Sequence, residues 1–263
     1  MSKSSDALIY LYARKHWPSG LSKEMTATAD DIEKAAQKAV ADLRKNATNT
    51  GVVVRLAGQS GSGKTTQLLP AAKAYFEKKK LKPILVAARE LMKYHPYYNE
   101  ILDRYGKAEI RKRTDDFATV MAYRVIRELT KERYDLIIDI AFASTKVEKI
   151  FTILTAQYAT KIVLMMAVSE EVSEKLLAKR SWRHDRGMEK EFENANGKAL
   201  KFYGKICPDM RIIMWNFDDL EPIYDGGISG AFTPWANEMN RAASLNNNIE
   251  KLVQSKIEYI RKH

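Results

Sequence analysis

The chain has 263 residues, 45% of them hydrophobic and 10% aromatic, so it can bury one sizeable core and is too short for two full domains. Its formal net charge of +11 favours an anionic partner or substrate, a class that includes nucleic acid, membrane surfaces and phosphorylated small molecules. Cys207 is the single cysteine, which excludes an internal disulfide framework and is typical of a reducing compartment, so we expect a cytoplasmic protein.

Residues 1–50 are predicted to form an N-terminal helical segment. Within residues 22–46, an Asp- and Thr-rich start precedes apolar side chains that recur at helical spacing. These side chains are Ile32, Ala35, Ala36, Val40 and Leu43. No apolar run in the chain reaches the roughly 20 residues that a membrane helix requires, so we expect no membrane span.

From Val52 onward, short apolar strands alternate with amphipathic helices, which is typical of a parallel α/β sheet. We expect strands at residues 52–57, 82–88, 135–141, 161–168 and 211–217. We expect helices at residues 64–79, 96–104, 116–132, 146–158 and, in two or more pieces, 169–204. The pattern predicts an α/β, three-layer fold with a mainly parallel five-stranded sheet. We assign residues 51–245 to this domain and residues 246–263 to a basic C-terminal helix.

A phosphate-binding loop follows the first predicted strand. The stretch GQSGSGKTT, residues 58–66, fits the G-x4-G-K-[ST] pattern, with a strand before it and a helix after it. Glycines allow the tight turn that points consecutive N–H groups at phosphate oxygens. Lys64 is expected to reach the β- and γ-phosphates, and the Thr65 hydroxyl to bind Mg²⁺. The sequence therefore predicts ATP or GTP with Mg²⁺, held by Gly58, Gly61, Ser62, Gly63, Lys64, Thr65 and Thr66.

The rest of the chain narrows the class of P-loop protein. The N-K-x-D motif of GTPases is absent and no D-x-x-G directly follows a predicted strand, while the third strand ends in one carboxylate where motors and helicases usually carry an adjacent pair. A small-molecule kinase remains, in which an arginine-bearing segment closes over the nucleotide. Arg180, Arg183 and Arg186 recur at three-residue spacing, and we take Arg180 and Arg186 as candidate phosphoryl clamps. The alternative is a solvated basic helix face.

Three blocks together resemble the zeta toxin family of toxin–antitoxin systems. They are GQSGSGKTT, then ELMKYHPYYNEIL after the second strand, then RELTKERYDLIIDIAFAST around the third. The resemblance covers roughly residues 50–220 and implies a P-loop kinase fold. It also implies that ATP phosphorylates the 3′-hydroxyl of the amino sugar in UDP-N-acetylglucosamine, which is toxic because it disturbs the supply of cell-wall precursors.

The second block departs from the family at the catalytic base. The family reads D-x-D-x-F-x-x-x-H-P there, with its second Asp as the base, and His95 and Pro96 match the end of this pattern. His95 is a candidate substrate-binding residue or a structural helix start. Counting back without a gap puts Arg89 at the base position, whereas a one-residue deletion puts Glu90 there. We take Glu90 as the candidate base; the alternative is a helix-terminal carboxylate stabilised by the helix dipole.

The third block departs after the strand. Asp139 matches the acidic end of this block, which makes it a candidate acceptor ligand, a magnesium contact through water, or the base in place of Glu90. Ile140 and Ala141 stand where the family has Gly-Thr, which helps to hold the sugar nucleotide. Without the threonine hydroxyl of that pair, the chain can differ from the family in its substrate more than in its reaction type.

The resemblance also implies partners. Zeta toxins are held inactive by a separate antitoxin, so we expect an antitoxin in trans or an inhibitory role for residues 1–50 in cis; the alternative is that these residues are structural. A comparison with a chain that starts near residue 47 would distinguish the two. Two other functions remain open: a kinase of another small-molecule acceptor, and a nucleotide-dependent module that binds nucleic acid. No known nucleic-acid motif supports the second, so we expect neither nucleic acid nor a membrane as partner.

Overall fold

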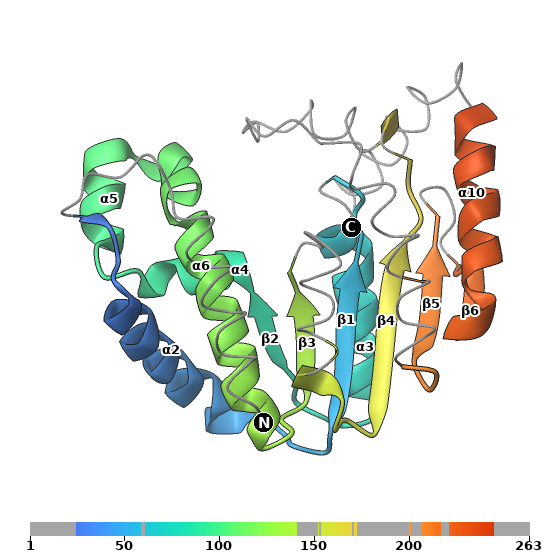
Figure 1. Cartoon of the computed structure of the whole chain (residues 1–263), viewed down its shortest axis with the longest axis horizontal. Coiled ribbons are helices and arrows are strands. Elements are labelled where there is room, and N and C mark those ends of the chain that lie inside the picture. The colour runs from blue at the N-terminus through green and yellow to red at the C-terminus, as the bar shows by residue number, and fades with distance from the viewer. Residues whose placement is uncertain are drawn as a thin grey trace.

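The computed structural model describes residues 25–58, 61–140, 152, 154–169, 171–172, 200, 207–216 and 221–244. Within them, one sheet has the strand order β2-β3-β1-β4-β5-β6, and the carboxyl ends of its parallel strands point up in Figure 1. The strands are β1 (Val52–Ala57), β2 (Ile84–Ala87), β3 (Leu136–Asp139), β4 (Thr160–Met166), β5 (Arg211–Trp215) and β6 (Tyr224–Gly227). The predicted α/β fold with a mainly parallel sheet is confirmed.

The parallel strands are apolar because helices cover both faces of the sheet. Strand β1 lies between β3 and β4, with Val54 opposite both Ile137 and Ile162, and all six of its residues are buried. On one face, β1 and β4 pack against helix α3 (Leu69–Lys78), whose Phe76 is fully buried. On the other face, β2 and β3 pack against the long helix α6 (Lys107–Lys131). These layers place the end of β1 at the centre of the molecule (Figure 1).

The sixth strand and the helix after it were not predicted. Strand β6 pairs antiparallel with β5, and its sequence YDGG has no apolar alternation. The Arg211 guanidinium holds β6 by two hydrogen bonds of 2.7 and 2.6 Å to the Asp225 carboxylate. Helix α10 (Phe232–Ser244) follows, with Pro234 inside its first turn, where proline is tolerated. Side-chain pairing across the sheet, rather than local propensity, therefore defines this edge.

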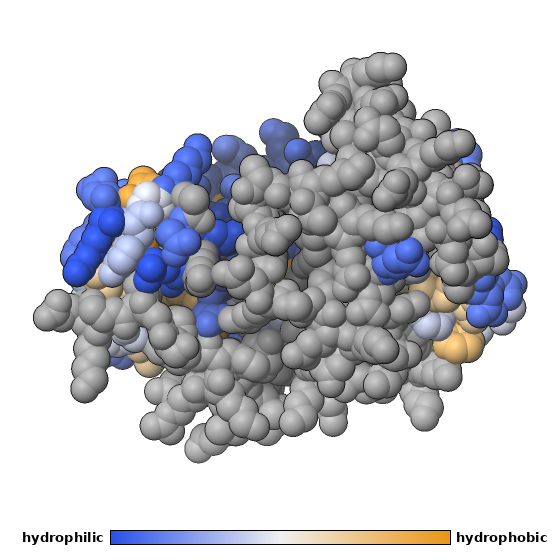
Figure 2. Space-filling view, turned by 90° about the horizontal axis from the view of Figure 1, so that it is seen from above, coloured by the Kyte–Doolittle hydropathy of each residue, from blue (hydrophilic) through white to orange (hydrophobic). Residues whose placement is uncertain are grey.

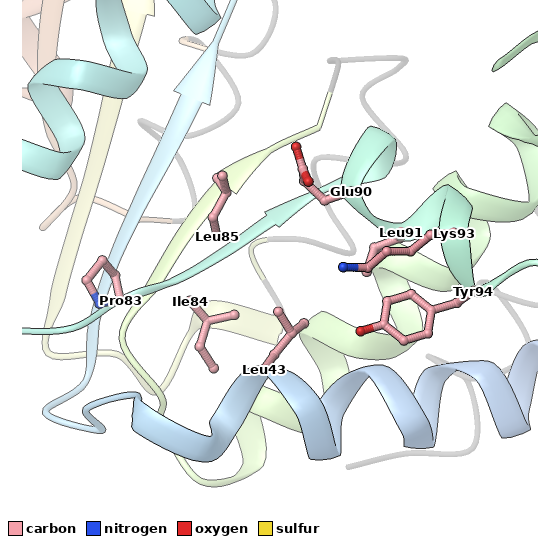
Figure 3. A pocket seen from close by; sticks show the side chains of 8 residues that line it. All are labelled: Leu43, Pro83, Ile84, Leu85, Glu90, Leu91, Lys93 and Tyr94. Carbon is pink, nitrogen blue, oxygen red and sulfur yellow. The ribbon is translucent and has the colours of Figure 1, made fainter. Parts of the chain in front are cut away.

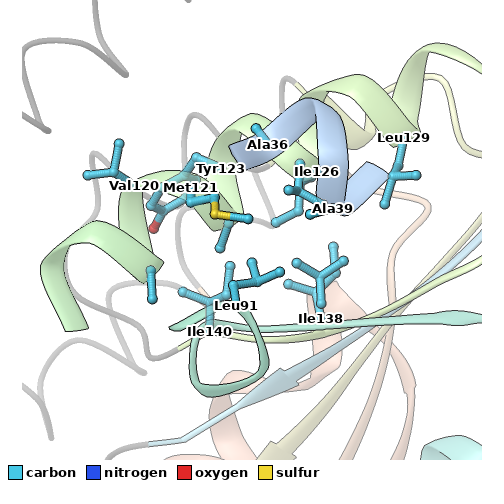
Figure 4. Close-up of a cluster of buried hydrophobic side chains, with 14 of the residues drawn as sticks. Ala36, Ala39, Leu91, Val120, Met121, Tyr123, Ile126, Leu129, Ile138 and Ile140 are labelled. Atoms are coloured by element: carbon cyan, nitrogen blue, oxygen red, sulfur yellow. The ribbon is translucent and has the colours of Figure 1, made fainter. Parts of the chain in front are cut away.

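Helix α2 (Ala29–Leu43) belongs to the same core as the sheet. It begins with a capping box in which Asp31 N–H donates to Thr28 Oγ1 at 3.2 Å and Thr28 N–H donates to Asp31 Oδ2 at 2.8 Å. In Figure 4, its Ala36 and Ala39 lie against α6 beside Ile126. The Arg124 guanidinium of α6 also pairs with the Glu33 carboxylate of α2. The predicted helix within residues 22–46 is therefore present and covers α6.

The amino end of the sheet is closed by a buried carboxylate. Asp135, which is 0% exposed, accepts hydrogen bonds from the Thr50 hydroxyl and the Val52 N–H, both at 2.9 Å. The Thr48 hydroxyl and the Thr50 N–H also donate to it. These contacts tie the starts of β1 and β3 together. The amino end is thus occupied by structural contacts, which leaves the carboxyl end for chemistry.

The remaining described elements are short. They are η2 (Arg44–Asn46), η3 (Lys64–Leu68), α4 (Ala88–Leu91), η4 (Met92–Tyr94), α5 (Tyr98–Tyr105) and η5 (Ile228–Gly230). Helix α6 starts nine residues earlier than predicted because Gly106, at φ 78°, ends α5 and lets α6 begin at once. Most of the helices predicted at 146–158 and 169–204, and the C-terminal helix at 246–263, lie outside the described residues. Among the described helices, none is long and apolar enough to cross a bilayer.

Candidate nucleotide and acceptor site

The phosphate-binding loop sits at the carboxyl end of β1, as its sequence predicts. Strand β1 ends at Ala57, and the chain turns through Gly58 and Gly63 into η3, which continues as α3. Gly58 has φ 143°, and a Cβ there would lie 2.6 Å from Ser62 Oγ, so no other residue fits. Gly63 has φ 98° and precedes the first helical residue, Lys64. The backbone is therefore shaped as an anion-binding turn ahead of a helix.

The side chains of the loop rest on internal partners. Lys64 Nζ donates a 2.6 Å hydrogen bond to the Gly58 carbonyl oxygen. Ser62 is fully buried, and its hydroxyl has no hydrogen-bond partner among the described residues. A buried hydroxyl of this kind is an unused donor that faces the loop interior. The loop thus holds an ammonium group and an unsatisfied donor where phosphate oxygens would be bound.

One arginine connects the loop to the next two strand ends. Arg89, in α4 just after β2, donates from Nη1 to Thr65 Oγ1 at 3.0 Å. Its Nη2 lies 3.6 Å from Asp139 Oδ2 at the end of β3, and its Nε lies 3.3 Å from Glu90 Oε1. Each nitrogen of the guanidinium therefore faces a different residue. This arrangement brings together Thr65, Glu90 and Asp139, three of the predicted site residues, around Arg89.

The two candidate carboxylates differ in their surroundings. Asp139 is the last residue of β3, where it lies opposite Ala87 of β2, and its side chain is 9% exposed. The Glu90 side chain is 56% exposed and borders a cavity of about 290 Å³ between β2, α4 and α2. In Figure 3, the Glu90 carboxylate points away from Leu43 and Tyr94, at the rim of that cavity. Asp139 is the more enclosed of the two.

The oxygen atoms at the strand ends fit a magnesium ion. Mg²⁺ prefers hard oxygen ligands and is usually bound through one or two protein oxygens together with phosphates and water. Thr65 offers an exposed hydroxyl, and Asp139 a carboxylate linked to it through Arg89. Over the described ranges, no group of three or more His, Cys, Asp or Glu side chains is placed to hold a metal by itself. A metal here would therefore depend on nucleotide phosphates.

His95 lies inside the fold rather than at the strand ends. It is 4% exposed, and its ring packs edge-on against Phe117 of α6 with 4.6 Å between ring centroids. Its Nδ1 accepts a hydrogen bond of 3.2 Å from the Tyr97 N–H. Burial lowers the pKa of its imidazole to about 4, against a smaller opposing effect of the Asp31 carboxylate. This setting favours the structural alternative for His95.

The surface beside the site is strongly polar. Seen from above, the described residues over α5 and α6 are mainly hydrophilic (Figure 2). Arg113 there stacks over the Tyr105 ring at 3.7 Å from the centroid, and its guanidinium lies 3.4 Å from Glu109. The predicted phosphoryl clamps Arg180 and Arg186, together with Arg183, lie outside the described residues. They remain predictions.

Sequence reasoning underestimated Arg89. The count back from His95 without a gap already put Arg89 at the position of the family's base, and Leu91 at the position of the family's Phe. Leu91 is 1% exposed and belongs to the core, as expected of that aromatic position. The one-residue deletion would put Met92 at the Phe position, and Met92 is also buried in the core, so burial does not distinguish the two counts. Arg89 rather than Glu90 is the residue that contacts the phosphate loop.

Comparison with known proteins agrees with this geometry. The family model described as Zeta toxin matches residues 36–201, which is more than half of the chain. Toxin PezT of Streptococcus pneumoniae serotype 4 is 29% identical over 105 residues, 40% of this chain and 40% of that toxin, so the chain spans under half of this curated relative. A structure from the PezAT chromosomal toxin–antitoxin system of S. pneumoniae has a TM-score of 0.60 at 18% identity and covers 92% of this chain and 100% of its own. This last likeness shows a shared fold.

Proposed function

Because the chain belongs to the zeta toxin family, we propose that it transfers the γ-phosphoryl group of ATP to a hydroxyl of a sugar nucleotide. The specific acceptor that we propose is the 3′-hydroxyl of the amino sugar in UDP-N-acetylglucosamine. The observation that carries this proposal is the meeting of a phosphate loop, through Arg89, with the enclosed carboxylate Asp139 at one edge of the sheet. A kinase needs both a phosphate cradle and a nearby proton acceptor.

The loop residues bind the nucleotide. The N–H groups that follow Gly63 bind the phosphate chain, and the start of η3 adds its dipole. When the nucleotide binds, the Lys64 ammonium leaves the Gly58 carbonyl oxygen and forms charge-assisted hydrogen bonds with the β- and γ-phosphates. Thr65 is the residue that would hold Mg²⁺, together with phosphate oxygens and water. When bound, Mg²⁺ neutralises charge on the phosphates during transfer.

The acceptor hydroxyl needs a carboxylate within hydrogen-bond reach to take its proton. An arginine at position 89 cannot do this, since its guanidinium stays protonated in proteins. Among the described residues, Asp139 and Glu90 are the carboxylates that contact Arg89, and Asp139 is the one at a strand end beside β1. We therefore propose Asp139 as the base, ahead of Glu90. Arg180 and Arg186 keep their proposed role as clamps on the transferred group.

We further propose that an antitoxin regulates the chain. The related fold comes from a toxin–antitoxin system, and a kinase that consumes a cell-wall precursor must be restrained in its own cell. The described part of residues 1–50 supports the core through α2, which leaves inhibition to a partner in trans or to residues ahead of α2.

The proposal is tested with γ-labelled ATP and a panel of sugar nucleotides, other nucleotides and simple sugars. We expect the wild-type protein to label UDP-N-acetylglucosamine and the Lys64→Ala variant to leave it unlabelled. Arg44→Gln, a change in the exposed η2 turn, serves as the matched control and should keep full activity. Label on a different acceptor would retain the kinase and reject the proposed substrate. Hydrolysis of ATP without label on any acceptor would show that the protein does not transfer the phosphoryl group to a second substrate.

A further inference from the structure

Arg89 stands at a position where the chemistry of the site does not call for a cation. A kinase base at this position would be a carboxylate, yet here a guanidinium lies between Thr65, Glu90 and Asp139. The Arg89 side chain is 38% exposed, so it is neither locked in the core nor fully solvated. Three polar partners around one planar group make this a positioned side chain, because each of its nitrogens is directed at a different oxygen.

Arg89 contacts the hydroxyl of Thr65, the residue expected to bind the metal. In a phosphate loop of this kind, the oxygen of this hydroxyl is the protein ligand for the metal that accompanies the nucleotide. Arg89 Nη1 donates to that same oxygen at 3.0 Å. A guanidinium and a divalent cation carry the same sign of charge, so both are disfavoured on one hydroxyl at the same time. Binding of the metal therefore requires Arg89 to leave Thr65.

Lys64 is held by an internal oxygen in the same way. Its ammonium rests on the Gly58 carbonyl, a partner that cannot remain when phosphates enter the loop. Both cations of the site are thus held by internal oxygens. An arginine beside the phosphate loop can bind phosphate oxygens with two parallel hydrogen bonds.

We propose that Arg89 takes the metal's place on Thr65, supplies positive charge to the phosphates when the nucleotide binds without metal, and is displaced from Thr65 when the metal binds. The proposal rests on the nucleotide binding proposed above. Two consequences follow. ATP should bind in the absence of Mg²⁺ with Arg89 supplying the positive charge, and Mg²⁺ should improve the affinity less than it would without Arg89, because it must displace the guanidinium.

The test is the dissociation constant of the β,γ-imido analogue of ATP, measured by calorimetry with Mg²⁺ and with EDTA. In EDTA, Arg89→Gln should weaken binding about 10-fold or more, the loss expected when a charge-assisted hydrogen bond disappears. With Mg²⁺, the same variant should bind within about 3-fold of the wild type, since the metal then supplies the charge. Arg89→Lys should restore part of the metal-free binding. Arg44→Gln should match the wild type in both buffers, and thermal unfolding shows whether each variant is folded.

An Arg89→Gln variant that binds like the wild type in EDTA would overturn the proposal. So would equal losses in both buffers, because they would mean that Arg89 and the metal do not compete for Thr65. These results would leave the kinase proposal in place. A wild-type chain that binds the analogue in neither buffer would instead contradict the nucleotide site itself, and this inference with it.

Discussion

At the scale of single residues, Asp139 and Glu90 are candidates for one chemical task. Both carboxylates contact Arg89, but Asp139 is nearly enclosed at the end of β3 and Glu90 is mostly exposed at the rim of a cavity. A group that takes a proton from an acceptor must be held beside the phosphate loop and shielded from water. These conditions favour Asp139.

Asp139→Asn should therefore lower kcat about 10²- to 10⁴-fold, the range expected for the loss of a general base. Glu90→Gln should lower it by less than about 3-fold, since its carboxylate is more than half exposed. Steady-state kinetics with UDP-N-acetylglucosamine and ATP measure both. Titration with the ATP analogue should show that both variants still bind nucleotide. The reverse order of effects would make Glu90 the base.

The buried His95 side chain should make the stability of the fold depend on pH. Its pKa is about 4 in the folded chain because of burial, against 6.5 for an ordinary histidine. Between these values the unfolded chain binds more protons, so stability is full above pH 6.5 and is lost as the pH falls toward 4. The loss amounts to at most about 3 kcal/mol. Urea unfolding from pH 7.5 to 4.5 measures this loss.

The matched variant for that titration is His95→Asn, whose side-chain oxygen can still accept from the Tyr97 N–H. The other three histidines are the same in both proteins, so the difference between the two curves isolates His95. The curve of the variant should be flatter between pH 6.5 and 4. Parallel curves would show that folding does not lower the pKa of His95.

At the scale of elements, helix α2 changes how the N-terminal segment can be tested. A chain that starts near residue 47 loses Ile32, Ala35, Ala36 and Ala39, all buried in the core against α6. It would test folding instead of inhibition. A chain that starts at residue 25 keeps every described contact of α2, including its capping box.

We expect the chain from residue 25 to unfold cooperatively and the chain from residue 47 to lose its cooperative transition, because exposed core surface costs a large part of a typical stability of about 5–15 kcal/mol. Thermal unfolding by circular dichroism measures this. The chain from residue 25 should also keep the kinase activity of the full chain. A clear rise in its activity would show that residues 1–24 inhibit in cis.

The joint between β1 and β3 depends on Asp135. Asp135→Asn replaces one accepting oxygen by an NH₂ group, which would face either the Thr50 hydroxyl and the Val52 N–H or the Thr48 hydroxyl and the Thr50 N–H. We expect a loss of about 2–4 kcal/mol, because hydrogen bonds to a buried charge are replaced by donor–donor contacts. Guanidinium unfolding measures the loss. The exposed control Asp42→Asn should change the free energy of unfolding little. Equal losses for the two variants would contradict the role of Asp135 in linking β1 to β3.

Elements that depend on local sequence could be predicted, and those that depend on distant partners could not. The loop from Gly58 to Thr66 and the buried strand β1 follow from glycine spacing and from a continuous apolar run. Strand β6 and α10 do not, because β6 is held by a bidentate contact between residues 14 positions apart. The role of Arg89 could not be predicted from the sequence either, because it depends on how the fold brings three strand ends together.

At the scale of the whole molecule, the charge of +11 now has a more specific interpretation. The positive groups that the structure assigns to the site, Lys64 and Arg89, lie at the carboxyl end of the sheet, where a nucleotide and a second phosphorylated molecule would meet. The polar surface over α5 and α6 borders the same end (Figures 1 and 2). This distribution fits a kinase with two anionic substrates.

The central claim is phosphoryl transfer to a sugar hydroxyl, and phosphorus NMR of UDP-N-acetylglucosamine incubated with ATP, Mg²⁺ and the protein tests it most directly. We predict a new phosphomonoester signal that couples to the proton at carbon 3 of the amino sugar, and no such signal with Lys64→Ala. An unchanged UDP-N-acetylglucosamine spectrum beside consumed ATP, or a phosphomonoester on any other molecule, would contradict the account.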